Sequence, residues 1–489
     1  MTASIDMLIV GAGFGGLGAA IHRRRAGDDN FLLIEQAAGV GGTWWANRYP
    51  GAACDIPSHL YSFSFAPNPN WTRKFPGQAE IEAYLNDCVR RFDIGSRLRL
   101  NTCLVGLRWD EASRCWQAHL RGTGGHEDVV SARTVTLATG PLSRPAAPKI
   151  EGLDRFAGPV IHTARWPRDF AAEGHAVGVI GTGASAIQVV PQLARHARQL
   201  SVFQRTAPWI LPRGDAPIGP RARWALAHVP GLRSAWRATI YALHELRAPA
   251  FTRHPNWLKR LEPLALAHLH RRIPPGRLRD ALTPDYRMGC KRILIADDYY
   301  PALRKPHVQL ETATIVAVEP AGVRLNDGRL IRLDALVTAT GFEAAEVGPP
   351  CEVIGPQGLS LGEVWRRGPV GYLGTMVAGF PNLFTVIGPN TGLGHNSMVH
   401  IIESQLALID DAMRTLKQHP TLAPLPAAQD RFNREMQERL RHTIWATGGC
   451  TSWYQTRDGR ITTLWPGSTL EFRRRTRRIH PADFGLSAI

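Results

Sequence analysis

Short apolar runs alternate along the chain with stretches in which apolar residues recur at helical spacing, a pattern typical of mixed α/β proteins. The run Met7 to Val10 precedes a helical stretch and a second run, FLLIEQ. The run Val177 to Ile180 precedes a helical stretch and the run LSVFQR in the same order. Strand, helix and strand in this order form a βαβ unit with parallel strands. The pattern therefore predicts two units of one design.

Further elements follow from the same periodicities. Residues 78–91 carry Ile81, Leu85, Cys88 and Val89 on one stripe, which predicts a helix. An apolar run within 382–389 predicts a buried strand, and the string 391–398 that follows should open a helix. The aromatic and proline-rich segment 61–71 predicts a loop. We also expect a small antiparallel meander with strands around 98–107, 116–120 and 129–137.

Each βαβ unit contains a glycine-rich turn between its first strand and its helix. The first turn reads Gly11-Ala12-Gly13-Phe14-Gly15-Gly16, and the second reads Gly181-Thr182-Gly183-Ala184-Ser185-Ala186. Both match G-x-G-x-x-G/A, in which small residues let a helix N-terminus approach a pyrophosphate. A tight turn alone also selects small residues, but two matched turns in one chain predict two dinucleotide sites.

The residue at the end of each second strand separates the two cofactors. Glu35 follows Gly11 by 24 positions, and Arg205 follows Gly181 by 24 positions. An acidic side chain accepts hydrogen bonds from ribose hydroxyls, whereas an arginine accommodates a 2′-phosphate. We therefore predict an α/β fold with two Rossmann-like dinucleotide-binding domains, the first for FAD and the second for NADP.

Composition narrows the class of protein. The chain has 489 residues, of which 44% are hydrophobic and 20% charged, as in globular proteins of two or three domains. Its formal net charge of +17 comes from arginine spread along the sequence, and no nucleic-acid recognition module accompanies it. The charge favours attraction for an anionic dinucleotide or weak affinity for acidic surfaces. We predict no nucleic-acid partner.

Cysteine usage and apolar run lengths indicate the compartment. Seven cysteines are odd in number and form no C-x-x-C pair, which argues against a disulfide framework or a zinc site. We predict a reducing compartment and no metal. The N-terminal residues lead directly into a strand, and no apolar run reaches the length of a membrane span. The prediction is a cytoplasmic protein without an integral membrane segment.

Two motifs outside the turns carry polar residues in unusual settings. Asp55 ends a string of glycines and aromatic residues that begins at Gly39. Such an aspartate is either a turn or cap residue or part of a ligand site. Lys291 and Arg292 follow Gly289 and precede an apolar run. A dibasic pair is often merely solvated, but this setting favours a pair that points into a site.

The string Phe156-x-Gly158-x-x-x-His162-x-x-x-Trp166-Pro167 resembles the fingerprint of type I Baeyer–Villiger monooxygenases, in the flavin-containing monooxygenase superfamily. The resemblance covers nearly the whole chain. It implies an NADPH-dependent enzyme that inserts one oxygen atom of O2 into a ketone through a flavin peroxide, giving an ester or lactone. The substrates would be a small-molecule ketone and O2.

The resemblance also implies roles for single residues. Arg292 would stabilise negative charge during oxygen transfer, Asp55 would hold Arg292 in place, and Lys291 would reach NADP. His162 and Trp166 would link NADP binding to domain closure. The expected cofactor-binding residues are Gly11, Gly13, Phe14, Gly16, Glu35, Gly42, Thr43, Trp44, Asp55, Tyr61, Val105, Gly181, Thr182, Gly183, Ala184, Ser185, Gln188, Arg205, Thr206, Lys291 and Arg292.

The repeated triplets Ala138-Thr139-Gly140 and Ala339-Thr340-Gly341 resemble the crossings between the family's two nucleotide-binding domains. They predict a first part of the FAD domain at 1–150 and an NADP domain at 151–340, with a helical insertion near 220–280. Residues 341–489 would complete the FAD domain and supply a C-terminal active-site segment.

Some alternatives stay open. Leu232, Trp236, Ile240 and Leu243 form a stripe that either lies on a membrane surface or packs on its own domain, and we favour packing. The segment 452–467 departs from the best-described members and is closer to aryl-ketone and heteroatom-oxidising branches. A monooxygenase acting on sulfur or nitrogen is therefore the main rival. A disulfide-type flavin reductase is disfavoured because the chain has no closely spaced cysteine pair.

Overall fold

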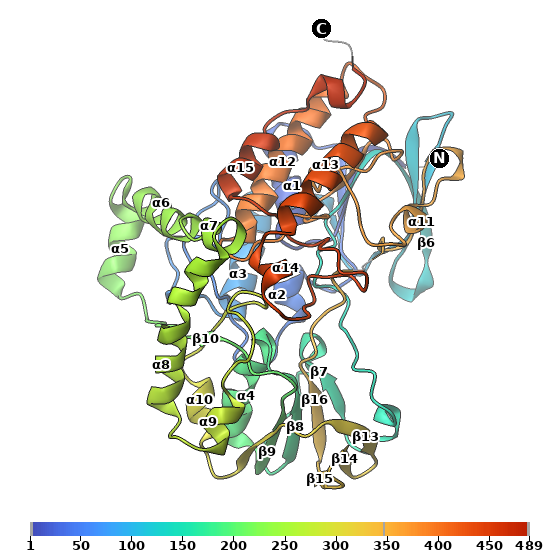
Figure 1. Cartoon of the computed structure of the whole chain (residues 1–489). Coiled ribbons are helices and arrows are strands. Elements are labelled where there is room, and N and C mark those ends of the chain that lie inside the picture. Colours follow the sequence, from blue (N-terminus) through green and yellow to red (C-terminus); the bar gives the residue numbers. More distant parts are fainter. Residues whose placement is uncertain (1–2, 346–347, 487–489) are drawn as a thin grey trace.

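The computed structural model describes residues 3–345 and 348–486. Two sheets dominate it and lie at opposite ends of the molecule (Figure 1). The larger sheet has the strand order β17-β4-β5-β6-β1-β2-β3, with β18 paired to β6, and the smaller has the order β12-β9-β8-β16-β7. Because the neighbours include non-consecutive strands joined by helices, the predicted α/β class is confirmed.

The first βαβ unit forms the centre of the larger sheet. Strand β1 (Ala3–Val10) lies parallel to β2 (Phe31–Ile34) and to β6 (Glu127–Leu137), with helix α1 (Phe14–Arg25) between β1 and β2 in sequence. At the turn, Gly11 has φ of 99°, and a Cβ there would lie 2.7 Å from the Ala138 carbonyl oxygen. Only glycine fits this approach.

The second unit repeats this contact. Strand β8 (Ala176–Ile180) lies parallel to β9 (Gln199–Phe203) and β16 (Ala335–Thr338), and helix α4 (Ala184–His196) follows β8. Gly181 has φ of 115°, and its Cβ would lie 2.6 Å from the Ala339 oxygen. In both units the backbone carbonyl of the alanine in the Ala-Thr-Gly triplet lies against the first glycine of the turn.

The antiparallel meander is β4 (Cys103–Asp110), β5 (Cys115–Arg121) and β6. The predicted strand around 98–107 is in fact two: β3 (Leu98–Arg99) pairs with β2 before the chain turns. Asn101 has φ of 51°, a left-handed conformation that interrupts an extended strand. Helix α3 spans Gln78–Arg91 as predicted and buries Ile81, Leu85 and Cys88.

The last third of the chain returns to the larger sheet. Strand β18 (Leu383–Thr385) is fully buried beside β6, and α12 (Met398–Thr415) opens on the Ser397 cap, as predicted. Helices α12, α13 (Pro426–Leu440) and α15 (Thr469–Arg475) gather beside α1 (Figure 1). The smaller elements are α2 (Thr43–Ala46), β7 (Val160–His162), β10 (Ile210–Leu211), α9 (Arg277–Ala281), β11 (Leu294–Ile295), α10 (Tyr299–Leu303), β12 (Val308–Glu311), β13 (Ile315–Glu319), β14 (Gly322–Leu325), β15 (Leu330–Arg332), β17 (Glu352–Ile354), α11 (Leu361–Val364) and α14 (Ile444–Thr447).

The segment predicted to be helical is helical. It comprises α5 (Pro220–His228), α6 (Leu232–Glu245), α7 (Ala248–Thr252), the 3-10 turn η5 (Pro255–Arg260) and α8 (Glu262–Arg272). These elements follow one edge of the molecule (Figure 1). Only Ile240 of the predicted stripe is buried, whereas Leu232, Trp236 and Leu243 are exposed. The interpretation that this stripe packs on its own domain is therefore wrong for three of its four members.

Candidate active site

The first turn has the geometry of a dinucleotide site. Helix α1 begins at Phe14 and its Gly13 cap makes no side-chain hydrogen bond, so backbone N–H groups face the turn. Glu35 is buried at the end of β2, where its two carboxylate oxygens accept hydrogen bonds from Ala12 N (2.7 Å) and Ala37 N (2.9 Å). The carboxylate is thereby fixed beside the turn, which fits a ribose of FAD.

The predicted flavin-side residues lie against this turn. Gly42 has φ of 54°, and its Cβ would lie 3.0 Å from the Gly13 Cα. Trp44 Nε1 donates to the Tyr61 hydroxyl at 3.0 Å, and the Tyr61 ring meets Phe14 edge-on at 5.1 Å. Thr43 opens the short helix α2 that carries Trp44. The structure thus brings three separate stretches of the chain into one apolar wall.

Two other predicted residues have different surroundings. Val105 lies where the register of β4 shifts against β5, and its expected contact with FAD stays a prediction. The Gln188 amide is occupied by protein: its oxygen accepts from the Tyr49 hydroxyl (2.8 Å) and its Nε2 donates to the Ala53 oxygen (3.0 Å). Gln188 therefore joins α4 to the segment before Asp55, and a contact with NADP would be additional to that role.

The second turn is built like the first, but the residue at the position equivalent to Glu35 is the cation Arg205. Helix α4 begins at Ala184 after the Gly183 cap, with Ser185 in its first turn, and no side chain caps it. Thr182 donates from its hydroxyl to the Thr206 oxygen at 2.9 Å, which ties the turn to the loop after β9. Arg205 precedes Thr206 and is exposed. A phosphate would meet backbone N–H groups and a guanidinium there.

Lys291 lies close enough to Arg205 for their charges to interact. Burial and the neighbouring Arg205 charge lower the pKa of Lys291. Its ammonium lies 4.9 Å from the centre of the Tyr286 ring, and neither cation forms an ion pair within the described part of the chain. Two neighbouring cations without an ion-pair partner fit the 2′-phosphate of NADP, which would relieve their repulsion.

Arg292 and Asp55 meet as predicted. The guanidinium donates from Nε (3.0 Å) and from Nη2 (2.6 Å) to Asp55 Oδ2. The Asp55 charge raises the pKa of Arg292 further above its ordinary value, so the group stays charged at every working pH. The Arg292 side chain keeps 41% of its surface accessible, so a ligand can reach it.

The C-terminal segment adds a residue that the sequence did not assign. Tyr454 is buried next to this pair, and burial raises its pKa to about 12 although the Arg292 charge opposes the shift. Arg213 donates to the oxygen of Cys54, the residue before Asp55, at 3.2 Å. The aromatic pair Trp453-Tyr454 was the available signal for the first residue, whereas nothing in the sequence marked Arg213.

A disulfide lies immediately before the dibasic pair. Cys290 and Cys450 are bonded, with their Cα atoms 6.1 Å apart. The expectation of a chain without disulfides is therefore wrong at this pair, because neither the parity nor the spacing of cysteines reports which ones meet in space. The bond ties the Lys291–Arg292 loop to the C-terminal segment, four residues before Tyr454.

The fingerprint residues hold the crossing between the sheets. His162 ends β7, and its Nδ1 accepts from Ala164 N at 3.1 Å. The His162 ring lies 6.0 Å from Phe342, just after the second Ala-Thr-Gly triplet, and burial lowers its pKa. Trp166 packs edge-on against Phe170 at 5.5 Å. These contacts are structural, and a role in domain closure stays a prediction.

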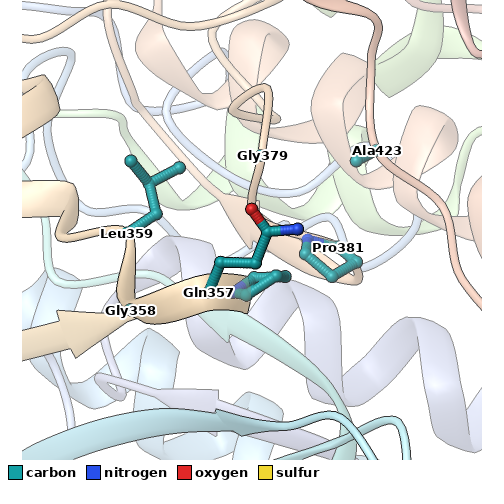
Figure 2. Close-up of a pocket in the computed structure, with 7 residues that line it drawn as sticks. Gln357, Gly358, Leu359, Gly379, Pro381 and Ala423 are labelled. Atoms are coloured by element: carbon teal, nitrogen blue, oxygen red, sulfur yellow. The ribbon is translucent and has the colours of Figure 1, made fainter.

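A surface depression elsewhere has no comparable chemistry. It has a volume of about 550 Å³ and lies beside η6 (Pro356–Gly358), with Leu359, Gly379, Pro381 and Ala423 on its walls. Figure 2 shows the Gln357 amide as its only polar side chain. Within 3–345 and 348–486, no cluster of metal-ligating side chains occurs and no helix is long and apolar enough to cross a membrane.

Comparisons with known proteins agree with this geometry. A family model described as pyridine nucleotide-disulphide oxidoreductase matches residues 5–246. A Baeyer–Villiger monooxygenase of Streptomyces coelicolor is 45% identical over 98% of the chain and 92% of its own length. A Baeyer–Villiger monooxygenase of Pseudomonas aeruginosa is 44% identical over 98% of the chain and 91% of its own length. The chain belongs to the Baeyer–Villiger monooxygenases.

Solved structures support this assignment. The closed structure of cyclohexanone monooxygenase matches with a TM-score of 0.86 and 28% identity, covering 97% of both chains. A steroid monooxygenase bound to NADP matches with a TM-score of 0.83 and 32% identity over the same shares. The predicted family, its NADPH-dependent flavin monooxygenase class and the cofactors FAD and NADP are confirmed. FAD-dependent Baeyer–Villiger oxidation is the activity of this family.

Proposed function

We propose that Arg292 is the catalytic residue for oxygen transfer to a ketone carbonyl and that Asp55 positions it. The observation that carries the proposal is the pair of hydrogen bonds from Nε and Nη2 to a single Asp55 oxygen. They fix the guanidinium while 41% of its side chain remains open to a ligand. Bound FAD, once reduced by NADPH, supplies the activation of O2 in this chemistry.

The charge of Arg292 matches what the reaction needs. Attack on a ketone carbonyl leaves negative charge on the former carbonyl oxygen, and a fixed cation stabilises that charge without reorganising. The raised pKa of Arg292 keeps the cation at every working pH. A preorganised donor of this kind lowers the activation free energy by about 3–4 kcal/mol. The buried Tyr454 next to the pair limits water on that side.

We assign the NADPH site to the turn at Gly181 with Arg205 and Lys291. The mutual approach of these two cations, neither of them paired within the described residues, supports a preference for NADPH over NADH. The membership of strands in the two sheets supports domain boundaries at about residues 150 and 340. Strands β7, β8, β9, β12 and β16 all lie between these limits, whereas β1–β6, β17 and β18 lie outside them.

A ketone is the substrate class that we propose, with O2 as co-substrate. Relatives named for ketone chemistry, such as cyclohexanone monooxygenase, support this class. A thioether or amine substrate is the alternative, since the segment 452–467 departs from the best-described members. We further propose a cytoplasmic enzyme without a nucleic-acid partner.

A substrate panel tests the function directly. Cyclic, aryl and linear ketones and one thioether are incubated with enzyme and NADPH, and oxygenated products are quantified instead of NADPH loss. Esters or lactones from at least one ketone are the expected result. Sulfoxide formation alone, with no ester from any ketone, would assign the enzyme to the heteroatom class instead.

A further inference from the structure

Helix α6 is oriented against the usual rule for surface helices. Such helices turn an apolar stripe to the core and polar side chains to solvent. In α6, Arg237 Nη1 donates to the His59 oxygen at 2.7 Å, and the Tyr241 hydroxyl lies 2.9 Å from the Thr469 hydroxyl. Glu245 Oε2 accepts from Asn396 Nδ2 at 2.7 Å. The polar side chains of this helix therefore point into the protein.

Apart from the buried Ile240, the large apolar side chains of α6 are exposed. Leu232, Trp236 and Leu243 are spaced by four and seven positions and share one face of the helix. Leu246, the cap residue, lies three positions further on the same face. The exposed fraction is 48% for Trp236, 56% for Leu243 and 74% for Leu246. Leu232, Trp236, Leu243 and Leu246 thus form an exposed apolar stripe on α6, whereas Ile240 beside them is buried.

Neighbouring elements carry further exposed apolar residues. Fifteen large apolar residues are exposed among those that the structure describes, and nine of them fall within positions 224–264. Elements α5, α6, η5 and α8 follow one edge of the molecule (Figure 1). The nine residues, called here the outer patch, are Trp224, Val229, Leu232, Trp236, Leu243, Leu246, Trp257, Leu261 and Leu264.

The same segment is strongly basic. Residues 220–272 contain ten Lys or Arg against two Asp or Glu, which gives eight of the chain's 17 net positive charges. Both acids are engaged inside, Glu245 with Asn396 and Glu262 with the Met288 N–H at 3.1 Å. None of the ten cations forms an ion pair with a described residue. The exposed ones are Arg221, Arg247, Arg253, Lys259, Arg260, Arg271 and Arg272.

We propose that the outer patch docks on the surface of a membrane containing acidic lipids. Tryptophan and leucine enter the boundary between headgroups and acyl chains, while cations beside them contact acidic headgroups. Each Lys or Arg near such a surface strengthens binding about fivefold. A second copy of this chain is disfavoured as the occupant, because a symmetric dimer would bring eight net charges against eight of the same sign.

The test uses full-length FAD-loaded enzyme and extruded vesicles of phosphatidylcholine, with and without phosphatidylglycerol. Co-sedimentation is expected with the acidic vesicles, weakly or not at all with the neutral ones, and it should fall as ionic strength rises. Tryptophan emission should shift to the blue only with acidic vesicles. Equal sedimentation with both vesicle types, or none with either, would overturn the proposal.

Matched variants locate the surface. The double variant Leu243→Ser, Leu246→Ser should weaken vesicle binding about tenfold or more. The control Val316→Ser, Leu359→Ser alters exposed apolar residues elsewhere and should bind normally. Arg271→Gln with Arg272→Gln should weaken binding, whereas Arg477→Gln with Arg478→Gln on the C-terminal tail should not. Equal losses in test and control variants would contradict the assigned surface.

Two further measurements separate folding and self-association from lipid binding. Every variant should keep its FAD absorbance and ketone oxidation, because the outer patch lies outside the proposed catalytic residues. Light scattering without vesicles should give the same mass for wild type and the Leu243, Leu246 double variant. A dimer that this double variant dissociates would identify a second copy as the occupant and overturn the proposal.

Discussion

Arg292 and Asp55 lie 237 positions apart in the chain, yet one carboxylate oxygen of Asp55 accepts two hydrogen bonds from the guanidinium. Asp55 follows the aromatic string after α2, and Arg292 lies just before β11. The pair therefore connects the segment after α2 with the loop before β11. A cation that both parts hold is well placed to respond to both cofactors.

The first prediction is that Arg292→Ala retains FAD but loses ester formation by a few hundredfold or more, as for removal of a preorganised charge. NADPH consumption that continues should release hydrogen peroxide without product. Asp55→Ala should lose less of its ester-forming activity, because Asp55 only orients the guanidinium of Arg292. Arg287→Ala is the matched control, since Arg287 contacts Asn256 instead of Asp55. Product formation by Arg292→Ala near the wild-type rate would refute the catalytic assignment.

The second prediction concerns cofactor choice. Arg205→Ala should raise KM for NADPH roughly tenfold or more and leave KM for NADH nearly unchanged, because a lost charged hydrogen bond costs about 1.5–3 kcal/mol. Steady-state kinetics with both cofactors measure this. Arg198→Ala serves as the control, since Arg198 pairs with Asp334 at the other end of β9. Equal weakening for both cofactors would mean that Arg205 does not contact the 2′-phosphate.

The third prediction follows from the Cys290–Cys450 disulfide, whose partners are separated by 160 positions. Removing a bond that closes so long a loop costs about 2–5 kcal/mol. Cys450→Ser and treatment with reductant should therefore lower the midpoint of denaturant unfolding to a similar extent. Cys103→Ser, at an exposed free cysteine, is the control. Thiol trapping in rapidly quenched cells tests the bond in vivo: reduced cysteines there would mean that the bond forms only after lysis.

The fourth prediction is a loss of stability in mild acid. Burial, together with the Arg237 charge, lowers the pKa of His59 to about 4 and that of His400 to about 3. Between pH 6.5 and 4 the unfolded chain binds protons that the folded chain does not, so the free energy of unfolding falls as pH falls. Each histidine contributes up to about 1.4 kcal/mol per pH unit.

Denaturant unfolding at pH 7, 6 and 5 measures this loss. The double variant His59→Asn, His400→Asn should have a flatter dependence on pH, whereas His126→Asn, at an exposed position, should keep the wild-type slope. An unchanged slope in the double variant would show that other groups cause the acid sensitivity.

Local sequence determined the elements that short-range interactions control. The stripe of Ile81, Leu85 and Cys88 marked helix α3 to the residue, since helical periodicity depends only on neighbours within one turn. Glycine at 11 and 181 followed from the backbone conformation that each turn requires. The spacing from these glycines to Glu35 and Arg205 is fixed by the length of one βαβ unit, so the two cofactors could be told apart.

Tertiary structure alone decided the contacts between distant segments. The bond between Cys290 and Cys450, and the approach of Tyr454 to Arg292, depend on how the C-terminal segment packs, and no local pattern encodes that packing. Which face of α6 points into the protein was likewise not predictable from the sequence. Its periodicity defined an apolar face, but the hydrogen bonds of Arg237 and Glu245 to other parts of the fold turned the polar face inward. An amphipathic helix can turn either its apolar or its polar face to the rest of the fold, and the contacts with neighbouring segments decide which face points inward.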